Sequence, residues 1–102
     1  MAMPSSPKSI WLERCSGCFV DHVELRHFRR RAIFLTHTLD AEVSLSWMHD
    51  ATDWDGKSHG YGVDIWHSQH PTVRHNDFTG VFRHPLLLSW GAREALFFQN
   101  QV

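Results

Sequence analysis

The sequence predicts an α+β fold in which a small antiparallel sheet of three to five strands packs with one or two short helices. Alternating apolar and polar residues indicate half-buried strands in three windows, at 33–39, 43–49 and 61–67. Short apolar segments beside turn-forming residues at both ends of the chain favour the helices. With 102 residues, the chain is sized for one domain with a single core.

The N-terminal part predicts a leader followed by a short helix. We expect residues 1–9 to be a flexible leader and residues 10–102 to form a single small globular domain. Ser6 and Pro7 can cap and open a helix that carries the apolar residues 10–12. Such a helix has barely two turns and therefore depends on tertiary packing.

The windows 33–39 and 43–49 predict two paired strands of an antiparallel hairpin. If residues 40–42 form the loop, Leu39 faces Val43 and the apolar residues of both strands lie on one face of the sheet. A shift of one residue would mix polar and apolar positions. The loop has no glycine for a left-handed turn position, but we expect burial to outweigh this defect.

The other segments complete the predicted domain. Residues 22–28 suit a further strand, and residues 92–96 suit a terminal helix. Pro85 either opens this helix or interrupts a strand. We see no internal repeat with a period of 20 to 50 residues.

Composition and chain ends restrict the function classes. The formal net charge is -1, so no strongly basic or acidic character points to a partner. The first residues lack the charged and apolar regions of a secretory signal, and no apolar run approaches the roughly 20 residues that span a bilayer. We therefore expect an intracellular protein without membrane insertion.

Two cysteines and two histidines predict a structural zinc site. Cys15, Cys18, His22 and His27 form the pattern C-x2-C-x3-H-x4-H. Thiolates and imidazoles are the ligands of tetrahedral zinc, and C-x2-C is the usual half site. The pattern resembles a zinc knuckle only loosely, because one residue is missing before the first His and the last ligand is not Cys. The alternative is a pair of reduced cysteines in a turn.

An arginine cluster predicts contacts with a phosphate backbone. Four of the eight arginines lie within six residues: Arg26, Arg29, Arg30 and Arg31. Arginine binds phosphate through two parallel hydrogen bonds, and the adjacent Phe28 could add stacking. A charged loop paired with nearby carboxylates is the alternative. The leading hypothesis is a non-enzymatic, zinc-supported module that binds nucleic acid.

Two other function classes stay open. The segment from His67 to His84 could serve a small metal-dependent enzyme, because His75 and Asp77 have the H-x-D spacing of facial-triad iron sites. Exposed Trp54 and Trp66 could instead anchor a protein-protein interaction adaptor, since Trp and Arg dominate interface hot spots.

Overall fold

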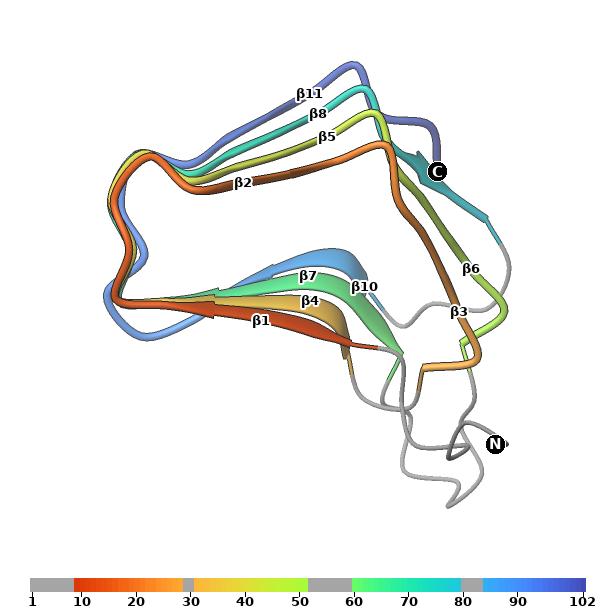
Figure 1. Ribbon diagram of the computed structural model, residues 1–102, viewed down its shortest axis with the longest axis horizontal. Coiled ribbons are helices and arrows are strands. Elements are labelled where there is room, and N and C mark those ends of the chain that lie inside the picture. Colours follow the sequence, from red (N-terminus) through yellow and green to blue (C-terminus); the bar gives the residue numbers. More distant parts are fainter. Residues whose placement is uncertain (1–8, 29–30, 52–59, 80–83) are drawn as a thin grey trace, which may run out of the picture.

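Inward-facing apolar residues recur at equivalent places in four successive segments of the chain. The computed structural model describes residues 9–28, 31–51, 60–79 and 84–102, and there the chain winds through four coils of a parallel β-helix (Figure 1). The strands are β1 (Ile10–Glu13), β2 (Phe19–Asp21), β3 (Glu24–Arg26), β4 (Arg31–Thr36), β5 (Glu42–Ser44), β6 (Trp47–His49), β7 (Tyr61–Trp66), β8 (Thr72–Arg74), β9 (Asp77–Phe78), β10 (His84–Leu88) and β11 (Leu96–Phe98).

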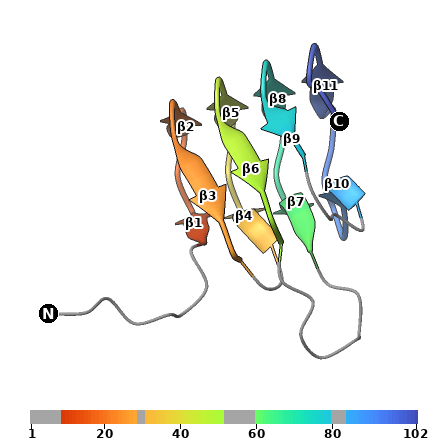
Figure 2. The same ribbon diagram turned by 90° about the vertical axis from the view of Figure 1, so that its right-hand side faces the viewer.

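Three parallel sheets form the three sides of the β-helix. The first sheet has the order β1-β4-β7-β10, the second β2-β5-β8-β11 and the third β3-β6-β9. Figure 2 shows the strands of successive coils side by side. Every strand therefore pairs with its counterpart in the next coil and not with the strand that follows it in the chain.

The core consists of columns of apolar side chains inside the coils. One column of the first sheet contains Ile10, Ile33, Val63 and Leu86. The second sheet contributes Val20, Val43, Val73 and Phe97. The third sheet adds Leu25, Met48 and Phe78. The members in the second and third coils are at most 1% exposed, so the centre of the β-helix is closed to water.

The predicted α+β fold is wrong. The described residues contain no helix: residues 10–12 lie in β1, residues 92–96 lead into β11, and Pro85 lies within β10. The predicted hairpin is also wrong, because β4 and β5 belong to different sheets whose pairings are parallel. Alternation of apolar residues identifies a buried strand face but is the same for parallel and antiparallel partners. The predicted leader 1–9 lies outside the described residues except for Ser9.

The chain has a repeat that the sequence analysis missed. Ile33 follows Ile10 by 23 residues, Val63 follows Ile33 by 30, and Leu86 follows Val63 by 23. The longer interval includes residues 52–59, which lie outside the described part. Because only apolar character and corner conformation recur, and not residue identity, comparing residue types along the sequence does not reveal this period.

Residues with left-handed backbone conformation form the corners of the coils. Twelve non-glycine residues in the described part have φ between +45° and +58°. Six of them are histidines: His22, His27, His37, His67, His70 and His75. Histidine is several-fold enriched in this conformation among non-glycine residues. Most of the nine histidines of the chain are therefore turn-forming residues of the β-helix.

Candidate functional site

A ladder of polar side chains joins the coils at the corner between the second and third sheets. The backbone N–H of Val23 donates to Ser46 Oγ at 3.3 Å, that of Ser46 to Asn76 Oδ1 at 3.0 Å, and that of Asn76 to Asn100 Oδ1 at 3.0 Å. Each coil thus supplies the acceptor for a corner N–H of the preceding coil. Buried peptide groups at this corner are satisfied without a regular strand pairing.

The two asparagines of the ladder also donate hydrogen bonds. Asn76 Nδ2 donates to Val43 O and to Asn100 Oδ1, both at 3.0 Å. Asn100 Nδ2 donates to Val73 O at 2.9 Å. Asn76 is 2% exposed, so its amide acts entirely within the protein. The ladder fixes the backbone from which neighbouring exposed side chains project.

An open groove of about 800 Å³ runs over this corner across all four coils. We call it the corner groove, and its exposed polar and aromatic lining includes His22, Glu24, Trp47, His75, Asp77 and Gln101. No Lys or Arg is among the described residues that line it. The corner groove therefore offers carboxylates, amides and imidazoles, but no permanent positive charge.

Trp47 on β6 is the central aromatic residue of the corner groove. Its register partners are Glu24 on β3 and Asp77 on β9, so a carboxylate flanks the indole on each side. The indole is held in place because Nε1 donates to Thr79 Oγ1 at 2.9 Å and the His49 ring stacks on it with centroids 3.9 Å apart. Trp47 nevertheless stays 44% exposed.

His49 supports Trp47 from within the protein. Its Nε2 lies 2.6 Å from Glu24 Oε2 and its Nδ1 lies 2.8 Å from Asp50 Oδ2. Burial alone lowers the pKa of His49, but the hydrogen bonds and negative charges of Glu24 and Asp50 together outweigh burial and raise this pKa above the ordinary value. A protonated His49 thus links the wall of the corner groove to the aromatic platform.

We expect protonation of His49 to stabilise the fold. Because the pKa is raised in the folded state, the stabilisation is fully present below the unfolded value of about 6.5 and is lost as pH rises through the folded pKa. Urea unfolding of the wild type and His49→Gln between pH 5.5 and 8.5 should show a stability advantage of the wild type that shrinks with rising pH. His70→Gln, which removes only an exposed pair with Glu94, is the control. An advantage over His49→Gln that does not change with pH would contradict this role.

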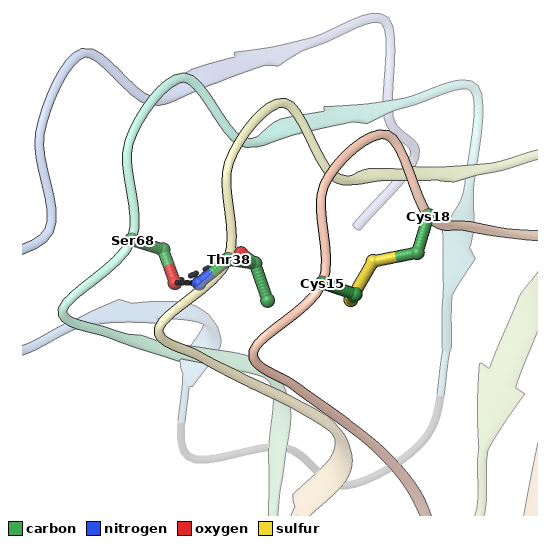
Figure 3. Close-up of a disulfide and its surroundings, with 4 residues drawn as sticks. All are labelled: Cys15, Cys18, Thr38 and Ser68. Carbon is green, nitrogen blue, oxygen red and sulfur yellow. Dashed lines mark hydrogen bonds between the residues drawn. A yellow bond between two sulfur atoms is a disulfide. The ribbon is translucent and has the colours of Figure 1, made fainter.

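The predicted zinc ligands do not come together in this structure. Cys15 and Cys18 are joined by a disulfide, so neither thiolate is available in this oxidised form (Figure 3). His22 contacts Asp21 at 2.9 Å, and His27 occupies the corner that follows β3. Within residues 9–28, 31–51, 60–79 and 84–102, no three His, Cys, Asp or Glu side chains are grouped to hold a metal ion. Zinc binding stays a prediction for the reduced chain.

The disulfide lies beside a hydroxyl ladder of the following coils. Thr38, the counterpart of Cys15 in the second coil, donates from its N–H and Oγ1 to Ser68 Oγ at 3.2 Å and 2.9 Å (Figure 3). Ser68 Oγ in turn donates to Trp66 O at 2.8 Å. The first coil thus closes this corner covalently, whereas the next two coils use hydrogen bonds.

The predicted arginine cluster is divided between different surroundings. Arg31 pairs with Asp64 at 3.0 Å and lies 4.2 Å over the Phe34 ring on the outer face of the first sheet. Arg26 is exposed at the end of β3. Arg29 and Arg30 lie outside the described residues. Binding of nucleic acid by these four arginines therefore stays a prediction.

The residues of the other two hypotheses are also separated. His75 and Asp77 line the corner groove, but His67 lies at the corner between the first and second sheets, and His84 stacks on Tyr61 at 5.9 Å. Trp66 is half-buried and donates to Asp64 Oδ1 at 2.9 Å. Trp54 lies outside the described residues.

Sequence reasoning missed the importance of Trp47, Glu24 and the asparagine ladder. Only the 23-residue interval could have aligned Val23 with Ser46, and no residue type is shared between them. Comparison of the chain with protein-family models, curated proteins and solved structures found no match. The described part also contains no helix of sufficient length and apolar character to cross a membrane. The function is therefore argued from the chemistry of the corner groove.

Proposed function

We propose that this chain is a binding module whose corner groove holds a neutral oligosaccharide. The observation that carries the proposal is the partly exposed Trp47, fixed between Glu24 and Asp77 in a groove without Lys or Arg. A sugar ring presents an apolar C–H face that can pack on an indole. Its hydroxyl groups both donate and accept hydrogen bonds, which suits a mixed lining of carboxylates, amides and imidazoles.

The arrangement of the groove favours an extended ligand. Its lining comes from all four coils, and equivalent residues of neighbouring strands are about 4.8 Å apart. Glu24 and Asp77 are thus separated by two strand spacings, or about 10 Å along the axis. Several sugar units can therefore contact polar groups at once, and Gln99 and Gln101 extend these contacts onto the last coil.

The charge of the groove disfavours a nucleic-acid ligand at this place. A phosphate backbone requires Lys or Arg contacts, but its charges would here meet Glu24 and Asp77. A neutral chain avoids that repulsion. Binding in the corner groove should accordingly change little with salt, in contrast to the steep salt dependence of phosphate contacts.

The test is binding of neutral hexasaccharides of glucan, xylan and mannan type, measured by calorimetry and by tryptophan fluorescence. We expect one of these classes to bind and Trp47→Ala to weaken its binding at least tenfold, or by about 1.4 kcal/mol, through loss of the stacking surface. Trp47→Phe should keep most of the affinity. Thermal unfolding of each variant shows whether the fold is retained.

Trp11→Ala is the matched control, because Trp11 is 63% exposed but lies on the first sheet and packs edge-on against Phe34. It should leave binding unchanged. Absence of binding to all three sugar classes, or equal losses in both alanine variants, would reject the proposal.

A further inference from the structure

A second groove follows the corner between the first and second sheets. Arg14, His37 and His67 occupy the equivalent left-handed positions that follow β1, β4 and β7. The rings of His37 and His67 are stacked, with centroids 5.0 Å apart and planes 21° apart. Figure 1 shows this corner opposite the third sheet, where the four coils nearly overlap. One guanidinium and two imidazoles thus form a column along the axis.

The column lines a groove of about 500 Å³, which we call the imidazole groove. Its other polar lining residues are Ser16, Thr38 and Gln69, and no Asp or Glu is among the described residues that line it. The imidazole groove is therefore complementary in charge to the corner groove. It combines one permanent positive charge with two groups that become positive as pH falls.

We propose that the imidazole groove binds a tetrahedral oxyanion of the sulfate or phosphate type. His37 Nδ1 is 2.9 Å from Thr36 Oγ1, and within the described residues Nε2 of this ring has no hydrogen-bond partner. Two protonated imidazoles in a stack repel each other, and an anion beside both rings compensates this repulsion while it accepts their N–H bonds. Arg14, whose side chain is 74% exposed, adds a third donor group.

The surroundings keep the two rings in position without neutralising them. A Cβ atom at Gly91 would lie 2.9 Å from His67 Nδ1, so glycine leaves the space that this ring occupies. The charged group nearest the column is Glu13, which contacts Arg14 at 3.5 Å. At the next corner position, Asp40 is exposed and His70 pairs with Glu94 at 2.8 Å. Trp66, next to His67 in the chain, carries no charge.

Protonation and anion binding should therefore be coupled in this groove. At pH 8 only Arg14 carries a charge, whereas at pH 5.5 both imidazoles can be protonated. Sulfate is the probe of choice, because it stays a dianion across this range and any pH dependence must come from the protein. We expect sulfate to bind at least tenfold more tightly at pH 5.5 than at pH 8.

The experiment is calorimetric titration of the full chain with sodium sulfate at constant ionic strength, accompanied by NMR of the histidine rings. His37→Gln and His67→Gln should each remove most of the pH dependence. Arg14→Gln should weaken binding at both pH values and keep their ratio. Inorganic phosphate, added to the sulfate complex at pH 5.5, should displace sulfate if the site recognises the shared oxyanion chemistry.

His84→Gln is the matched control, since this ring stacks on Tyr61 away from the groove. An effect of this variant equal to that of His37→Gln would reduce the result to diffuse attraction between net charges and overturn the proposal. Equal sulfate affinity at both pH values would also overturn it. Neither outcome bears on oligosaccharide binding, because Trp47 lies in the other groove.

Discussion

Replacing Asn76 with alanine should lower the free energy of unfolding by about 3–5 kcal/mol, because buried backbone groups of two coils lose their partners. The N–H of Ser46 loses its acceptor, and the carbonyl of Val43 loses its donor. The N–H and carbonyl groups cannot turn to water, since Asn76 is 2% exposed and Val43 is fully buried. Urea unfolding followed by circular dichroism measures the loss.

Asn100→Ala is the control for the position of Asn76 within the ladder. Asn100 performs the same function for the third coil but is only half-buried, so water can replace part of its contacts. We expect a loss of about 1–2 kcal/mol there. If both alanine variants lose the same stability, burial of the amide is not what makes the ladder important.

Gly62→Ala should destabilise the fold by about 3 kcal/mol or more through overpacking. An added Cβ would lie 2.4 Å from the Pro85 carbonyl oxygen and 2.7 Å from Cε1 of Phe78. A carbonyl within a paired backbone cannot move aside as a flexible side chain can. The second coil has Ala32 at this place, but its third-sheet core residue is Met48, which is slimmer than Phe78.

Two variants separate steric overlap from the general cost of losing a glycine. Gly17 has φ of +69° and no atom within 4 Å of an added Cβ, so Gly17→Ala should cost only about 1 kcal/mol of backbone strain. Gly62→Ala combined with Phe78→Leu relieves the ring contact but leaves the backbone contact with Pro85. The double variant should therefore stay unstable, and full recovery would show that the ring alone imposes glycine at this place.

The sequence was sufficient to locate strand cores but not their partners. Ile33 and Val63 were assigned to buried strand faces, and both are fully buried in neighbouring strands of the first sheet. Nothing in their alternation distinguishes the parallel pairing from the predicted hairpin. Partner choice depends on contacts across 23 or 30 residues, and local patterns carry no information about these distances.

The predicted position of Trp47 failed for a local reason. The window 43–49 was treated as one strand with Val43, Leu45 and Trp47 on its inner face. Leu45 has φ of +54° and forms a corner, which ends β5 and reverses the side on which the next residues lie. Met48 is therefore buried, while Trp47 is exposed. A single left-handed residue can thus convert an expected core residue into a candidate ligand contact.

The histidines gave a similar lesson for the site. Their number suggested metal or catalytic chemistry, but six of them serve as corner residues at places where the backbone needs positive φ. Only the positions of the corners decide which histidines become neighbours, as His37 and His67 do. The Arg and Cys patterns could be found from spacing alone, but their surroundings could not, because each depends on the coil packed next to it.

The unequal length of the coils separates chain length from register. The interval between the second and third coils is seven residues longer than the others, since 30 exceeds 23 by seven, yet Ile33 still lies beside Val63 and Trp47 beside Asp77. The connection between β6 and β7 therefore behaves as a neutral insertion point. Segments of other lengths can be exchanged there by engineering or by evolution, while both grooves keep their walls.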